Sequence, residues 1–110
     1  MKGICANPGI VNGVALNLEN STTVTSDQSC YIIIAKSFTP DILMKYKSVI
    51  GFVTENGGVT CHAAILARMM NIPCIVGVKN ATQIIHDSQW IRICGDKIGE
   101  IGEVVILNGR

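Results

Sequence analysis

The sequence has 110 residues, of which 48% are apolar and 15% are charged, and its formal net charge is +1. A globule of this length has room for one core, so we expect a single domain over residues 1–110. These values exclude a multidomain enzyme with its own nucleotide site, a disordered chain and the basic footprint of a nucleic-acid-binding protein.

The cysteines stand at positions 5, 30, 61, 74 and 94, without a Cys-x-x-Cys pair. This odd, widely spaced set argues against a disulfide framework or a zinc ribbon and predicts reduced thiols. No apolar run approaches the roughly 20 residues that span a bilayer, and no signal peptide is indicated. The sequence therefore predicts a cytoplasmic protein that binds neither membranes nor nucleic acids.

In the first half of the chain, strands are predicted at residues 10–18, 30–35 and 49–54, with a polar loop at 21–29. The run at 30–35 is continuously apolar, which is typical of a strand buried on both faces. Thr39 supplies a helix cap and Pro40 a favourable first helical residue, so we expect a short helix over 40–46.

In the second half, a glycine loop leads into a predicted helix from Ala63 to Met70, which contains strong helix formers and no breaker. The helix should end at Asn71, because asparagine tolerates the left-handed conformation and Pro73 prevents continuation. Further elements are predicted as strands at 74–78, 90–94 and 104–107, a turn region at 95–102 and a short helix capped by Asn80 and ending at Ile85. Strands that alternate with helices indicate an α/β domain.

His62 stands at the start of the longer helix, shortly after two glycines. The backbone N–H groups and the positive dipole end at a helix N-terminus stabilise anions and disfavour a protonated imidazole. A neutral imidazole keeps a nucleophilic ring nitrogen. A phosphoryl group on that nitrogen would place negative charge where the helix end favours it, so the pattern fits a phosphohistidine.

Gly57, Gly58, Thr60 and Cys61, which precede His62 in the sequence, are expected to support a phosphate. The glycines can adopt positive φ and allow close approach, and Thr60 can cap the helix. The helix beyond is apolar on nearly every side, which predicts that it is buried and presents His62 rigidly.

Simpler interpretations stay open for each of these residues. A histidine after a Gly-Gly turn is more often a capping or otherwise satisfied polar residue. Cys61 next to His62 suggests a metal site, but no second ligand pair with metal-binding spacing follows, so we expect a small packing residue and no bound metal. The remaining expectations are His86 on the surface at a helix end, Met69 and Met70 in the core or at its boundary, and Arg68 in a structural pair with a carboxylate.

The run from Thr54 to Arg68, continuing from Asn71 to Val78, closely resembles the mobile phosphohistidine domain of phosphoenolpyruvate (PEP)-utilising enzymes. That family includes PEP synthase, pyruvate phosphate dikinase, enzyme I of the sugar phosphotransferase system and rifampicin phosphotransferase. Its hallmark is Gly-Gly-x-Thr-Ser/Cys-His, then an Ala-Arg helix and an Ile-Pro-x-x-Val-Gly strand. The Thr-Cys-His form resembles PEP synthase most. The similarity extends to residues 7–13, 39–41, 80–82 and 102–104.

The resemblance implies a three-layer β/β/α swivelling domain of a phosphotransferase. His62 would carry a phosphoryl group from PEP or a nucleotide to a second site, between a nucleotide-binding domain and a PEP/pyruvate-binding domain, in cis or in trans. The chain departs from the family pattern at Met69 and Ser88. These departures concern the subfamily and not the acceptor turn.

Phosphoryl transfer normally needs Mg²⁺ and cationic side chains around the phosphates. The sequence contains neither a Gly-x-x-x-x-Gly-Lys-Ser/Thr loop nor a dense Arg/Lys cluster to supply them. We therefore expect that the domain binds no cofactor, that partner domains hold Mg²⁺, and that His62 is phosphorylated in trans. Alone, the chain should neither hydrolyse nucleotide nor consume PEP. The alternative is a non-catalytic regulatory or interaction module with the same fold.

Overall fold

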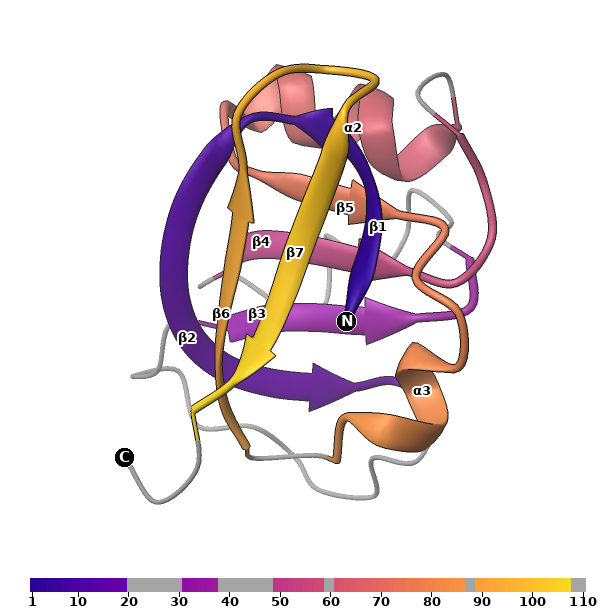
Figure 1. Ribbon diagram of the computed structural model, residues 1–110, viewed down its shortest axis with the longest axis vertical. Coiled ribbons are helices and arrows are strands. Elements are labelled where there is room, and N and C mark those ends of the chain that lie inside the picture. The colour runs from indigo at the N-terminus through magenta and orange to yellow at the C-terminus, as the bar shows by residue number, and fades with distance from the viewer. Residues whose placement is uncertain (20–30, 38–48, 59–60, 87–88, 108–110) are drawn as a thin grey trace.

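Seven strands and two helices make up the part of the chain that the computed structural model describes, which is residues 1–19, 31–37, 49–58, 61–86 and 89–107. In chain order (Figure 1) they are β1 (Lys2–Asn7), β2 (Gly9–Asn17), β3 (Tyr31–Ala35), β4 (Val49–Thr54), α2 (His62–Met70), β5 (Cys74–Val76), α3 (Ala81–Ile84), β6 (Trp90–Gly95) and β7 (Ile101–Ile106). The loop expected at 21–29 and the helix expected at 40–46 lie outside the described residues.

The described strands pair in one closed sheet, in the order β1-β5-β4-β3-β2-β6-β7, and β7 pairs again with β1. The pairs β2–β3, β3–β4 and β4–β5 are parallel. Each pair that includes β1, β6 or β7 is antiparallel. Figure 1 shows β3, β4 and β5 crossing behind β1, β6 and β7, with the curved β2 passing from one set to the other. A fold that mixes strands and helices is confirmed, but it is rich in sheet, and the expected two β layers are parts of one barrel and not separate sheets.

The two faces of β3 belong to two different cores, because successive residues of a strand point to opposite sides. Ile32 and Ile34 lie in the core enclosed by the barrel. Tyr31, Ile33 and Ala35 belong to the core between the barrel and α2. All of β3 is buried, which confirms the prediction of a strand covered on both faces.

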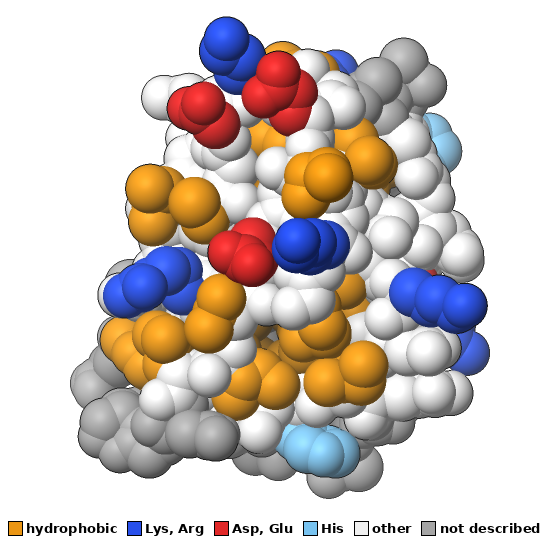
Figure 2. All heavy atoms as spheres, in the orientation of Figure 1, with side chains coloured by type: hydrophobic (Ala, Val, Ile, Leu, Met, Phe, Trp, Pro, Cys, Tyr) orange, Lys and Arg blue, Asp and Glu red, His pale blue; other side chains and the backbone are white. Residues whose placement is uncertain are grey.

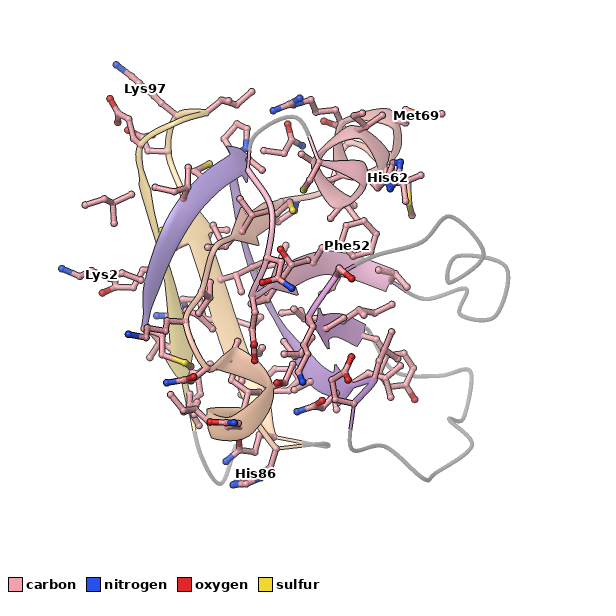
Figure 3. All side chains as sticks on the ribbon, turned by 90° about the vertical axis from the view of Figure 1, so that its right-hand side faces the viewer. Lys2, Phe52, His62, Met69, His86 and Lys97 are labelled. Carbon is pink, nitrogen blue, oxygen red and sulfur yellow. The ribbon has the colours of Figure 1, made fainter. Side chains whose placement is uncertain are left out.

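α2 packs on the sheet through a narrow face of small residues. Its buried residues are Ala63, Ala64 and Ala67. Phe52 of β4 lies beneath the helix (Figure 3) and belongs to the same core. Ile65 is 45% exposed and Met69 77% exposed. The predictions of a helix buried on nearly every side, and of Met69 in the core or at its boundary, are therefore wrong, because a single helix on a sheet buries only one stripe of its surface.

Polar contacts with β1 hold the C-terminal end of α2. The side-chain amide of Asn7 donates to the carbonyl of Ile72 at 2.7 Å. Arg68 donates from Nε and Nη2 to the carbonyl of Ala6, at 3.2 and 2.9 Å. Arg68 therefore has the structural role that was expected, but its partner is a backbone carbonyl and not a carboxylate. Asn71 ends the helix in the left-handed conformation, with φ of 59°, as predicted.

The largest differences from the predicted strands concern β1, β7 and β5. β1 was not predicted, and β7 begins at Ile101, three residues earlier than expected, where it pairs with β1. The strand predicted at 74–78 ends at Val76, since Gly77 has a φ of +68° and turns the chain away.

The face formed by β1, β6 and β7 carries apolar and charged side chains together (Figure 2). Across the β1–β7 pair, Lys2 stands opposite Glu103 and Ile4 opposite Ile101. Within the described residues, no helix has the length and apolar character that crossing a membrane requires.

Asn7→Ala is expected to lower the free energy of unfolding by about 1–3 kcal/mol, because it leaves the partly buried carbonyl of Ile72 without this donor. Urea unfolding measures the change. Asn12→Ala is the matched control, since the Asn12 side chain bonds Arg92 on the exposed surface and should cost less than about 1 kcal/mol. Equal losses in the two variants would contradict the role of Asn7.

Candidate functional site

α2 connects β4 to β5, which are parallel neighbours in the sheet. Parallel neighbours require a crossover connection, so α2 begins beyond the carboxyl end of β4. β3 ends at the same edge, because Ala35 pairs with Thr54. The residues after β3, the residues after β4 and the N-terminus of α2 therefore meet at one edge, which is where α/β sheets commonly bind ligands.

A pocket of about 110 Å³ opens at this edge. It is lined by Ser37, Thr54, Asn56, Gly57, Cys61, His62 and Ala63. Hydrogen bonds continue the pairing of β3 and β4 beyond the strands: the Glu55 N–H donates to Ala35 O at 3.1 Å and the Asn56 N–H to Lys36 O at 2.9 Å. These bonds bring the segments that carry Ser37 and Asn56 to the same side of the pocket.

His62 is exposed and is the first residue of α2. Cys61 occupies the N-cap position and makes no side-chain cap hydrogen bond. The Thr60 side chain, which was expected to cap the helix, lies outside the described residues. Among the described residues, nothing accepts a hydrogen bond from the backbone N–H groups of His62 and Ala63. Both residues line the pocket, which therefore lies at the N-terminus of α2, where the first N–H groups of a helix have no acceptor within the helix.

The two glycines of the loop differ in what the fold requires of them. Gly57 has a φ of +109°, and a Cβ there would lie 2.8 Å from the sulfur of Cys61. Gly58 does not have a positive φ, and a Cβ there would meet nothing within 4 Å. The freedom to adopt positive φ, expected of both glycines, is used at Gly57 and not at Gly58. Cys61 packs against the core beneath α2, as expected of a packing residue.

Glu55 ties the same loop to α3. Its Oε2 accepts hydrogen bonds from the Thr82 hydroxyl and, at 2.8 Å, from the Thr82 N–H. These two donors, the hydroxyl more than the N–H, lower the pKa of the Glu55 carboxyl below its usual range. Asn80 was predicted to cap α3 but makes no side-chain cap hydrogen bond. The carboxylate of Glu55, distant in sequence, supplies the acceptor instead.

The other groups considered for metal binding do not gather around His62. His86 is exposed and lies at the opposite end of the molecule (Figure 3), as expected of a surface residue. Burial raises the pKa of the Cys74 thiol far above its ordinary value, so that it stays protonated. Within the described ranges no three His, Cys, Asp or Glu residues are placed to hold a metal ion. That the chain binds no metal stays a prediction.

The pocket therefore combines an exposed imidazole with neutral hydrogen-bond donors and the positive end of a helix. No acidic residue stands in the first turn of α2. Sequence reasoning identified His62, Gly57 and Cys61 but missed Ser37, Thr54 and Asn56. Their position after two neighbouring parallel strands could have indicated them. An arrangement of this kind favours a small anion beside the imidazole ring.

The chain matches the model of a known protein family over most of its length. The sequence profile described as PEP-utilising enzyme, mobile domain, matches residues 28–98. A solution structure of Enzyme I resembles this fold with a TM-score of 0.57 and 32% sequence identity. That similarity covers 70% of this chain and 30% of the Enzyme I chain.

Curated relatives resemble the chain over most of its length. A probable phosphoenolpyruvate synthase from Methanothermobacter thermautotrophicus is 35% identical over 100% of this chain and 16% of its own length. A phosphoenolpyruvate-protein phosphotransferase from Mycoplasma genitalium is 44% identical over 79% of this chain and 15% of its own. A rifampicin phosphotransferase from Bacillus cereus is 38% identical over 84% of this chain and 11% of its own. The chain thus spans less than a fifth of each of these relatives.

Gly57→Ala and Gly58→Ala are expected to have different effects on the free energy of unfolding. Gly57→Ala should lower the free energy of unfolding by about 1–3 kcal/mol, because alanine is strained at positive φ and its methyl group meets the Cys61 sulfur. Gly58→Ala should change it by less than about 0.5 kcal/mol or raise it slightly. Urea unfolding of both variants tests this difference, and a large loss in Gly58→Ala would contradict the assignment.

Glu55→Gln is expected to change the pH dependence of stability. A carboxyl whose pKa is lowered by folding stabilises the protein above its unfolded pKa, which is about 4.3, and this contribution disappears as the pH falls through the folded pKa. The advantage of the wild type over Glu55→Gln should therefore be constant from pH 7 to about pH 5 and shrink below that. Urea unfolding at stepped pH measures it, and an advantage that grows on acidification would refute the role of Glu55.

Proposed function

Because the chain belongs to the mobile-domain family of PEP-utilising enzymes, we propose that it is a phosphoryl carrier whose acceptor is His62. The observation that carries the proposal is the position of His62, which is exposed at the N-terminus of α2 and lines a pocket there. The proposal keeps Gly57, Gly58, Thr60 and Cys61 as the residues expected to support the phosphate. Among these, Gly57 shapes the loop and Cys61 packs beneath it.

Histidine divides the transfer into two displacements at phosphorus. In the first, the bond between phosphorus and the donor oxygen breaks while a bond forms from phosphorus to a ring nitrogen of His62. In the second, that phosphorus–nitrogen bond breaks and the acceptor oxygen takes the phosphoryl group, which restores the neutral imidazole. The helix N-terminus favours the negative charge that the ring carries between the two steps.

We propose that the donor and acceptor sites belong to nucleotide-binding and PEP/pyruvate-binding domains, in cis or in trans, between which this domain swivels. The short coverage of each relative supports this, since most of their length lies outside the matched region. On α2, Ile65 and Met69 follow His62 by three and seven residues and are exposed, which supports contact with another protein domain.

The described residues do not fit a Mg²⁺ site, because Mg²⁺ prefers carboxylate and phosphate oxygens. Glu55 is the one acidic residue in the loop between β4 and α2, and its carboxylate is bonded to Thr82. We propose that partner domains hold the Mg²⁺ that neutralises the phosphates during transfer. In this chain, the residues around the pocket orient and bind the group that His62 receives.

The test incubates the chain with ³²P-labelled PEP and the PEP/pyruvate-binding domain of a related PEP synthase, or with labelled ATP and the nucleotide-binding domain. The chain should acquire acid-labile, alkali-stable phosphate, which His62→Ala abolishes and His86→Gln retains. The two variants are matched, because both histidines are exposed. Label that persists in His62→Ala would refute the acceptor. Absence of label with either donor would favour a non-catalytic module.

A further inference from the structure

We propose that the Ser37 hydroxyl and the Asn56 side-chain amide bind the oxygens of the phosphoryl group carried by His62. This inference rests on the proposed function and assigns ligand contacts to two residues outside the glycine and histidine turn. Both residues line the pocket that His62 also lines. They reach it from the ends of β3 and β4, whereas His62 reaches it from α2.

The sheet register fixes the position of these two residues. Ala35 and Thr54 are paired, and the bond from the Asn56 N–H to Lys36 O extends that pairing by one further step. Ser37 is the next residue after Lys36. Asn56 therefore stands on paired backbone and Ser37 directly follows it on the neighbouring segment, both at the carboxyl edge of the sheet where α2 begins.

The hydrogen bonds among the described residues of the pocket do not use these two side chains. Thr54 is completely buried, and its hydroxyl donates to the carbonyl of Asn56 at 2.7 Å, so Thr54 positions Asn56. Within the described part of the chain, the side chains of Ser37 and Asn56 have no hydrogen-bond partner. The residues that carry this hydroxyl and this amide line the pocket together with His62 and Ala63, whose backbone N–H groups have no acceptor among the described residues.

This donor set suits a phosphoryl dianion. A phosphoryl group has three oxygens besides its bond to the ring nitrogen, and neutral donors hold them without forming a strong ion pair. The described lining contains no Asp, Glu, Lys or Arg. An anion in the pocket thus meets neither a like charge that would repel it nor an ion pair that would hold it strongly. This suits a phosphoryl group that must be transferred to an acceptor.

The contacts should also slow the loss of the carried group to water. In hydrolysis, a water oxygen bonds to phosphorus and the phosphorus–nitrogen bond breaks. One proton of the water goes to the ring nitrogen, which leaves as neutral imidazole, and the product is hydrogen phosphate, HPO4²⁻. The loose transition state resembles metaphosphate, whose oxygens bear less negative charge than those of the dianion. Hydrogen bonds to these oxygens therefore stabilise the carried group more than the transition state.

The test needs no partner domain, because phosphoramidate can serve as a small phosphoryl donor. Its phosphorus–nitrogen bond breaks, a new bond forms to the ring nitrogen, and ammonia leaves. A His86→Gln background makes His62 the only histidine, since the sequence contains two. After removal of the donor, ³¹P NMR at pH 8 follows the half-life of the phosphohistidine.

Ser37→Ala and Asn56→Ala should each shorten that half-life by at least roughly three-fold, because each removes a hydrogen bond to a charged group. Asn56→Asp should shorten it further and lower the yield, since its carboxylate repels the dianion. Gln83→Ala is the matched control, because it removes an exposed amide from α3, outside the pocket lining. Thermal unfolding midpoints close to that of the parent confirm that the variants are folded.

Half-lives within two-fold of the parent in both alanine variants would overturn the inference. So would an equal effect in Gln83→Ala. These results are independent of the carrier test: a chain that takes label from PEP at His62 but shows unchanged half-lives keeps the proposed function and loses these contacts. Conversely, shortened half-lives without any transfer from PEP or ATP would leave the contacts in place and remove the carrier role.

Discussion

The parallel pairing of β4 with β5 is the constraint on which the site depends. Parallel neighbours cannot be joined by a tight turn, so the chain must return across the sheet, and α2 makes that return. The start of the helix is thereby placed beyond the carboxyl end of β4, next to the end of β3. The positions of His62, of the helix N-terminus and of the pocket all follow from this one connection.

Most elements were predictable because their local patterns agree with their tertiary setting. β4 has the predicted bounds, 49–54, because a short apolar run between polar residues is typical of a buried strand. α2 extends the predicted helix by one residue, and its end at Asn71 follows from the tolerance of asparagine for positive φ. His62 was identified from its position after two glycines and from the family resemblance, both of which are local in sequence.

The missed features depend on contacts between distant residues. β1 contains Lys2, Gly3 and Asn7, which are poor strand formers, and it becomes a strand by pairing with β5 and β7. The cap of α3 comes from Glu55, 27 residues before Thr82, which no capping pattern in sequence indicates. Ser37 was missed for the same reason, because only the register of two strands brings it beside Asn56.

The uncovered face of α2 has a consequence for the chain in solution. Ile65 and Met69 leave an apolar stripe in contact with water, while a net charge of +1 gives copies of the chain little mutual repulsion. Short-range apolar attraction between copies is thus opposed by almost no long-range electrostatic barrier. Added salt would screen only this weak repulsion. Self-association of the chain should therefore depend more on the apolar stripe than on the ionic strength.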